Sequence, residues 1–205
     1  MAEISVQPEK RKGSFLPWLL LLLGIIALCI FLFRTKGTKD TTDRDRTSYN
    51  NTSTNAAAAS GWSAINWSAA SVNYEEVSNR EIEVKSGDNY SVYGLGENVL
   101  FDRDESTLKP GAEYNLKQVV SSIDKRYKGG DVGLFGFTDA TGSKDHNKQL
   151  SQQRAETVRA WLVQHGIDDK HISIQAKGEN GPVASNNTGK GKEQNRRVEI
   201  VARKS

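Results

Sequence analysis

The chain has 205 residues, with 28 basic and 25 acidic side chains and a net charge of +3. This length suits one domain with appendages or two small domains, and so modest a charge gives no argument for nucleic acid as a partner. A single cysteine excludes a disulfide framework, and together with three histidines it offers too few ligands for a zinc site of the usual kind. We therefore expect neither a metal nor a cofactor.

The N-terminal part contains one long apolar segment. Residues 1–14 are polar, whereas residues 15–33 (FLPWLLLLLGIIALCIFLF) carry no charge. At about 1.5 Å per residue this segment can span a hydrocarbon core of about 30 Å. We expect a single transmembrane helix behind a short cytoplasmic tail. A cleaved signal peptide or a lipidated Cys29 is the alternative, but Leu28 stands where a small residue would precede a lipidated cysteine.

Two segments of different composition follow the apolar stretch. Residues 34–60 are rich in Thr, Ser, Asn, Asp and Ala without any apolar period, which is typical of a disordered, flexible linker. Residues 61–96 form a lead-in segment. Within it, alternating apolar positions at 81–85 and 90–95 flank the turn sequence SGDN. This pattern predicts a β-hairpin that precedes the main domain.

The remaining residues, 97–205, alternate between strand and helix patterns. We expect helices from Pro110 to near Gly129 and from the turn after Asp139 to near Gly166. Strands are expected at 99–101, 131–137, 172–176 and 198–202, with a long loop at 178–194. This order of elements predicts an α+β fold in which helices pack on one face of a small mixed sheet.

The second of these helices has an unusual residue on its apolar face. At about 100° per residue, Arg154 falls among the apolar and small side chains that share this face, which are Asn147, Leu150, Ser151, Val158, Trp161 and Leu162. A guanidinium that faces inward keeps its charge and requires an anionic partner. Asp139, in the turn before the helix, is the nearest candidate in sequence. We expect an Arg154–Asp139 pair, which serves either ligand binding or the attachment of helix to loop.

Catalysis finds little support in the residues. Ser151 has no histidine at the spacing of a nucleophile and its base, and a helical serine more often packs or bonds to the backbone. The acids Asp102, Asp104 and Glu105 precede a helix, where acidic residues are expected without any hydrolytic role. We expect a binding protein rather than an enzyme, with no catalytic residues.

Several separated motifs resemble the OmpA-like family of peptidoglycan-binding domains. They are ENVLFDRDESTLKPGA at 97–112, TDATG at 138–142, LSQQRAETVRAWL at 150–162 and NRRVEIV at 195–201. The similarity covers residues 90–203 in the family's own order. The resemblance implies the βαβαββ order of an OmpA-like domain for residues 97–205.

The resemblance also implies a function and a site. Such a domain would bind the diaminopimelate part of the peptidoglycan stem peptide without cutting it. Asp139 would meet the ligand ammonium and Arg154 its carboxylate, while Thr138 and Asn147 would line the pocket. Either Arg196 or Arg197 should also approach the ligand, and the sequence does not decide between them.

Two functional classes follow for the whole protein. In the first, residues 15–33 hold the protein in the inner membrane and the periplasmic domain tethers that membrane to the cell wall. In the second, the protein is a passive wall-anchoring subunit of a secretion or motor complex. A proton-driven stator would need an ionisable residue inside the membrane, and residues 15–33 contain none. The sequence leaves open whether the chain forms a homodimer or joins another envelope protein.

Overall fold

The computed structural model describes residues 61–205. The expected cytoplasmic tail, transmembrane helix and linker, at 1–14, 15–33 and 34–60, lie outside the described residues. None of the helices within 61–205 combines the length and the apolar composition that a membrane span requires.

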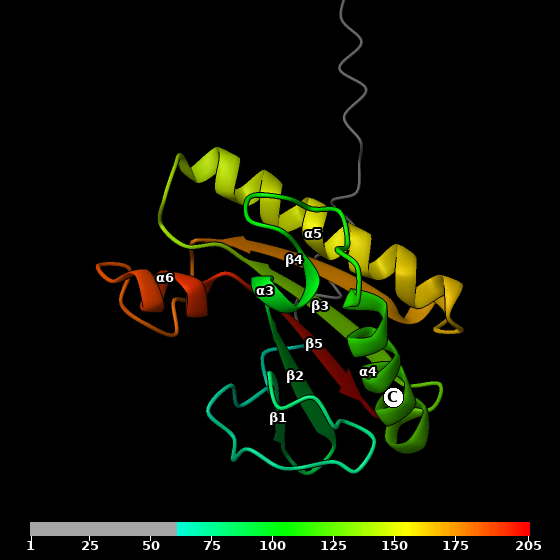
Figure 1. Cartoon of the computed structure of the whole chain (residues 1–205). Coiled ribbons are helices and arrows are strands. Elements are labelled where there is room, and N and C mark those ends of the chain that lie inside the picture. The colour runs from blue at the N-terminus through cyan, green and yellow to red at the C-terminus, as the bar shows by residue number, and fades with distance from the viewer. Residues whose placement is uncertain (1–60) are drawn as a thin grey trace, which may run out of the picture. The chain divides into compact units, whose positions relative to one another are not determined.

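A five-stranded mixed sheet forms the centre of the described part (Figure 1). In the order of the sheet, its strands are β1 (Ile82–Ser86), β2 (Tyr90–Gly96), β5 (Arg197–Arg203), β3 (Asp131–Phe137) and β4 (Ile172–Gly178). β3 and β4 run parallel, and the other neighbouring pairs run antiparallel. The predicted hairpin is confirmed, and its two strands belong to the same sheet as the three strands from residues 97–205.

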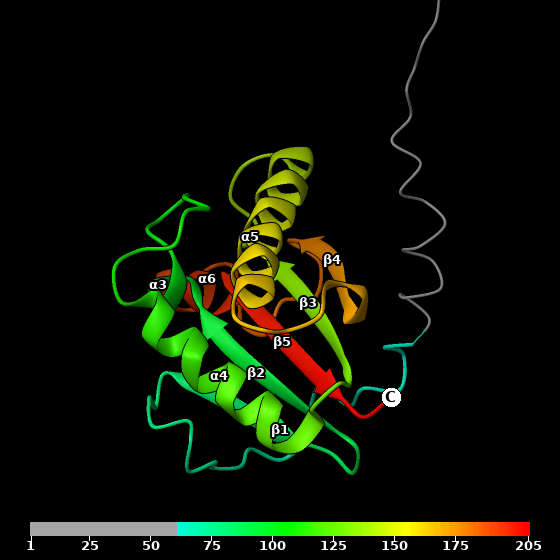
Figure 2. The same cartoon turned by 90° about the vertical axis from the view of Figure 1, so that its right-hand side faces the viewer.

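Two helices cover one face of this sheet, as predicted (Figure 2). They are α4 (Ala112–Tyr127) and α5 (Lys144–Gln164). Their buried faces share one apolar cluster with alternate residues of the strands, among them Leu116, Val158, Leu134 and Ile200. Burial of these side chains is the main contribution to holding the helices on the sheet, at about 25 cal/mol per Å² of apolar surface.

The sequence signals at the ends of α5 explain its length. Ser143 is the N-cap, and its hydroxyl accepts a hydrogen bond from the His146 N–H at 3.2 Å. Asp145 lies in the first turn, where a negative charge is favoured by the helix dipole. Gly166 follows the C-terminus with φ of 98°, a left-handed conformation that glycine adopts without a steric penalty. The helix therefore stops where the sequence predicts.

The opposite face of the sheet carries a second, smaller apolar cluster. Successive side chains of a strand point to opposite faces, so Phe135 and Phe137 of β3 lie here while Leu134 faces the helices. Trp62 and Ile65 from the lead-in segment complete this cluster with residues of β2 and β5. The segment before the hairpin thus covers part of the face that the helices leave open.

Two sequence-based expectations were wrong. Residues 99–101 do not form a strand, because the chain turns at once into the single-turn helix α3 (Glu97–Leu100), where the Phe101 N–H bonds to the Glu97 carbonyl at 2.8 Å. The expected loop at 178–194 contains a short helix, α6 (Gly189–Asn195), whose N-cap Thr188 accepts from the Gly191 N–H at 3.0 Å. The four residues of α3 are too few to show a helical period. α6 begins with the sequence GKG, and its two glycines, which disfavour helices, gave no sign of a helix in the sequence.

Candidate functional site

The ends of three strands meet at one edge of the sheet. Since β5 runs antiparallel to both β2 and β3, its first residue, Arg197, lies beside the last residues of those strands, Gly96 and Phe137. The residues immediately beyond this register come together for the same reason. They are Glu97 after β2, Thr138 and Asp139 after β3, and Arg196 before β5.

Two carboxylates and two guanidiniums alternate at this edge. Arg154, from α5, bonds to Oε1 of Glu97, and Oε2 of the same carboxylate accepts from Arg196 Nε. Arg196 Nη1 then donates to Asp139 Oδ2 at 2.8 Å. Glu97 and Asp139 are each 5% exposed and Arg154 is 1% exposed. The four formal charges sum to zero, which suits a site so poorly accessible to water.

The expected Arg154–Asp139 pair is replaced by a longer chain of contacts. Arg154 is buried on the inner face of α5, as predicted, but its carboxylate partner is Glu97. Asp139 instead pairs with Arg196. The prediction was wrong because it searched for the nearest anion in sequence, whereas the strand register brings in Glu97 from 57 positions away.

Asp139 is held in its charged form by its neighbours. Burial opposes ionisation, but hydrogen bonds from Arg196 and from the Thr141 N–H outweigh it, so the pKa of Asp139 lies below its ordinary value. The Thr141 bond is 2.7 Å long and reaches Oδ1, the oxygen that Arg196 leaves free. Burial likewise opposes the charge on Arg196, yet Asp139 and Glu97 raise its pKa. Asp139 and Arg196 therefore both carry their charges at neutral pH.

Arg196 and Arg197 point to different sides of the sheet. Arg196 belongs to the charge network, as described above. Arg197 lies over the ring of Phe137, with its guanidinium carbon 3.7 Å from the ring centre, and donates to Glu199 at 2.8 Å. Its Nη2 also donates to the Gly181 carbonyl at 3.2 Å. Of the two arginines between which the sequence does not decide, Arg196 lies next to Asp139 and Arg197 lies on the opposite face.

Residues 100–196 match the sequence profile of the OmpA family. These residues form an OmpA family domain. The match encloses α4, β3, α5, β4 and α6 together with Asp139, Arg154 and Arg196. The family membership inferred from the motifs is therefore confirmed.

Similar proteins of known sequence support this assignment. The probable lipoprotein YiaD of Escherichia coli (strain K12) is 45% identical over 117 residues, which cover 57% of this chain and 52% of YiaD. The peptidoglycan-binding protein ArfA of Mycobacterium tuberculosis is 40% identical over 106 residues, covering 52% of this chain and 32% of ArfA. The chain thus spans about half or less of the length of these curated relatives.

Solved structures share the architecture of the OmpA domain. The cell wall anchor of the T6SS from Pseudomonas aeruginosa aligns with a TM-score of 0.57 and 25% identity, covering 62% of this chain and 90% of that one. The periplasmic domain of Helicobacter pylori MotB aligns with a TM-score of 0.58 over 67% of this chain and 88% of that one. At 21% identity, the MotB likeness supports the fold alone.

Within the OmpA domain, Thr138 and Asn147 fix the loop that carries Asp139. The Thr138 N–H donates to the Gly178 carbonyl at 2.8 Å and so ties the end of β3 to the end of β4. Asn147, in the first turns of α5, donates from Nδ2 to the Asp139 carbonyl at 3.2 Å. Both side chains are buried. The two residues therefore hold the Asp139 backbone in place from two sides.

Two polar atoms at the OmpA site are buried and have no hydrogen-bond partner within residues 61–205. They are Arg154 Nη1 and Thr138 Oγ1. Arg154 Nε is satisfied by the Glu105 carbonyl at 2.8 Å and Nη2 by Glu97, so the guanidinium has one nitrogen left over. A buried donor without an acceptor is costly, by about 1–3 kcal/mol. An acceptor supplied by a ligand would remove that cost.

Glu97 is the member of the site that the sequence reasoning missed. It begins the motif ENVLFDRDESTLKPGA and directly follows the alternating strand pattern of β2, so a signal was present. Its position also explains its geometry, because the Glu97 N–H donates to the Arg196 carbonyl at 2.8 Å and fixes the two residues beside each other. An acidic residue directly after a predicted strand can be recognised in the sequence as a candidate site residue, but the residues that pair with it cannot.

Proposed function

We propose that the OmpA domain binds peptidoglycan non-covalently, through the diaminopimelate of the stem peptide, and so tethers a membrane to the cell wall without catalysis. The observation that carries this proposal is the buried guanidinium of Arg154, which has one nitrogen without a partner in residues 61–205 and lies beside the hydrogen-bonded Glu97–Arg196–Asp139 network. ArfA, which is named a peptidoglycan-binding protein, and the Pseudomonas aeruginosa cell wall anchor support the same function.

The roles of the charged residues follow from their chemistry. The free end of diaminopimelate is a zwitterion, with an ammonium and a carboxylate a few atoms apart. Its carboxylate would accept a charge-assisted hydrogen bond from Arg154 Nη1, the nitrogen that neither Glu105 nor Glu97 engages. Its ammonium would bind Asp139 and take the place of Arg196 Nη1 there. The site and the ligand end are each neutral in sum, so the exchange leaves no unbalanced charge in the buried site.

The rest of the chain suits a tether. Residues 15–33 would form the transmembrane anchor, with the OmpA domain in the periplasm and residues 34–60 as the spacer between them. A flexible spacer of this length reaches about 25–30 Å as a coil. The likeness to a secretion-system cell wall anchor favours a second version, in which the protein is a passive anchoring subunit of a larger envelope complex.

Co-sedimentation of the full chain with purified sacculi tests the proposal. We expect the wild-type protein to pellet with sacculi and the variants Asp139→Ala and Arg154→Ala to remain in the supernatant, since each removes one half of the zwitterion contact. Arg159→Ala is the control, because Arg159 lies on the same helix but pairs with Asp169 on the surface. Circular dichroism must confirm folding. Equal sedimentation of all four folded proteins would refute the site.

A further inference from the structure

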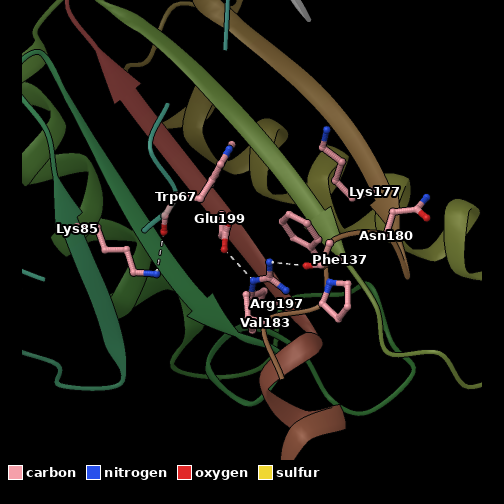
Figure 3. A pocket seen from close by; sticks show the side chains of 10 residues that line it. Trp67, Lys85, Phe137, Lys177, Asn180, Val183, Arg197 and Glu199 are labelled. Atoms are coloured by element: carbon pink, nitrogen blue, oxygen red, sulfur yellow. Dashed lines mark hydrogen bonds and ion pairs between the residues drawn. The ribbon is translucent and has the colours of Figure 1, made fainter. Parts of the chain in front are cut away.

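A separate cavity lies on the sheet face opposite to α4 and α5 (Figure 3). Its volume is about 430 Å³, within the range of small-ligand sites. The lead-in segment, β1, the end of β3, β4 and the start of β5 all contribute to its lining. The side chains that matter below are Trp67, Phe137, Val183, Lys85, Lys177 and Arg197.

One wall of this cavity is apolar and open. In the described part of the chain, four large hydrophobic residues are exposed, and two of these, Trp67 at 37% and Val183 at 59%, line the cavity. Phe137 also lines the cavity, with Arg197 over its ring. Isolated exposed apolar residues are common, but their gathering in one cavity is typical of a binding site.

The other walls carry an excess of positive charge. Arg197 is balanced by Glu199 at 2.8 Å, and Lys85 lies 3.5 Å from Glu83. Lys177 forms no salt bridge within residues 61–205, and its ammonium lies 5.5 Å from the centre of the Phe135 ring. Burial lowers the pKa of Lys177, and the nearby charge of Lys148 lowers it further, because no anion compensates for either effect. The cavity therefore offers a cation without a counter-ion next to an apolar wall.

We propose that this cavity is a second peptide site, in which Lys177 binds a carboxylate of the wall peptide while Trp67 and Phe137 contact its apolar part. This inference rests on the proposed function. The wall peptide is favoured over other anions because the two sites lie back to back at one edge of the sheet. Arg197, the first residue of β5, directly follows Arg196, and Phe137 stands two residues before Asp139. A polymer held at Asp139 would therefore carry further peptide groups within reach of Lys177.

The probe for this site is N-acetyl-D-alanyl-D-alanine, a D-peptide with a carboxylate but no ammonium. In ¹⁵N NMR titrations of the full chain, we expect it to shift the indole N–H of Trp67 and the amide of Gly181. Lys177→Gln should weaken this binding about tenfold, as the loss of a charge-assisted hydrogen bond implies. Lys170→Gln should leave it unchanged, because Lys170 is an exposed lysine just before β4. The same peptide with its C-terminal carboxylate amidated should bind the wild-type chain about as weakly as the unmodified probe binds the Lys177→Gln variant.

Several results would overturn the inference. Shifts confined to Thr141, next to Asp139, or equal affinities of Lys177→Gln and Lys170→Gln would exclude the cavity as the carboxylate site. Tighter binding of N-acetyl-L-alanyl-L-alanine would reassign the cavity to the C-terminus of a protein. These failures are distinct from failure of the proposed function, which would appear as sacculus binding that Asp139→Ala does not change while the cavity shifts persist.

Discussion

Glu97 is the carboxylate that two arginines of the site share. One of its oxygens accepts from Arg154 and the other from Arg196, so this single carboxylate bridges the two guanidiniums. Without it, Arg154 would retain only the Glu105 carbonyl and the face of the Phe101 ring, whose centre is 5.3 Å away. A buried arginine in such surroundings is an uncompensated charge, which is far more costly than the loss of a surface ion pair.

We therefore expect Glu97→Gln to lower the free energy of unfolding by about 3 kcal/mol, since it leaves a buried cation without its anion. Urea unfolding followed by circular dichroism measures this change. Glu83→Gln is the matched control: Glu83 pairs with Lys85 at 3.5 Å and its side chain is 57% exposed, so a change of at most about 0.5 kcal/mol is expected. Similar unfolding midpoints for the two variants would show that Glu97 is not a structural counter-ion.

At the scale of elements, apolar periods predicted the structure where they were long. The stripes of α4 and α5 and the alternation of β1, β2 and β4 were sufficient, because burial on one side imposes those periods. β3 and β5 were predicted from predominantly apolar segments, which fit strands that are buried on both faces. α3 and α6 were missed, since a single turn and a glycine-rich turn leave no period to read. In the site, the inward position of Arg154 was predictable from its helix face, but its partner depended on the register of β2 with β5, which no local pattern contains.

The contact of α5 with β3 depends on a residue without a side chain. A Cβ at Gly136 would lie 2.1 Å from the carbonyl oxygen of Ser151, a backbone atom of α5 that cannot move by itself. We expect Gly136→Ala to displace the helix and destabilise the fold by about 2–3 kcal/mol. Thermal unfolding measures the effect. Gly189→Ala is the control, because a Cβ there meets no atom within 4 Å, and a loss of stability equal to that of Gly136→Ala would contradict the close-packing explanation.

At the scale of the whole described molecule, the hairpin and the C-terminal strand depend on each other. β2 pairs with β5 along seven residues, from Tyr90–Arg203 to Gly96–Arg197. The hairpin also supplies core residues to the cluster beneath the helices, namely Ile82, Val84, Tyr93 and Leu95. A domain that began at residue 97 would expose the edge of β5 and lose these side chains together.

We predict that a fragment of residues 97–205 does not fold, whereas residues 61–205 do, because only the longer fragment retains β1, β2 and the Trp62 cluster. Dispersion of amide signals in ¹H–¹⁵N spectra distinguishes the two outcomes. Native dispersion and cooperative unfolding of the shorter fragment would show that the hairpin is an accessory to the sheet rather than a part of its core.

The central claim is that a zwitterionic wall-peptide end binds between Arg154 and Asp139. Calorimetric titration of the full chain with soluble stem peptides tests it most directly. One peptide has a diaminopimelate whose zwitterionic end is unmodified, and in the other the carboxylate of that end is amidated. The proposed contacts predict binding of the free form and at least about tenfold weaker binding of the amidated form. Equal affinities for the two peptides would contradict the claim.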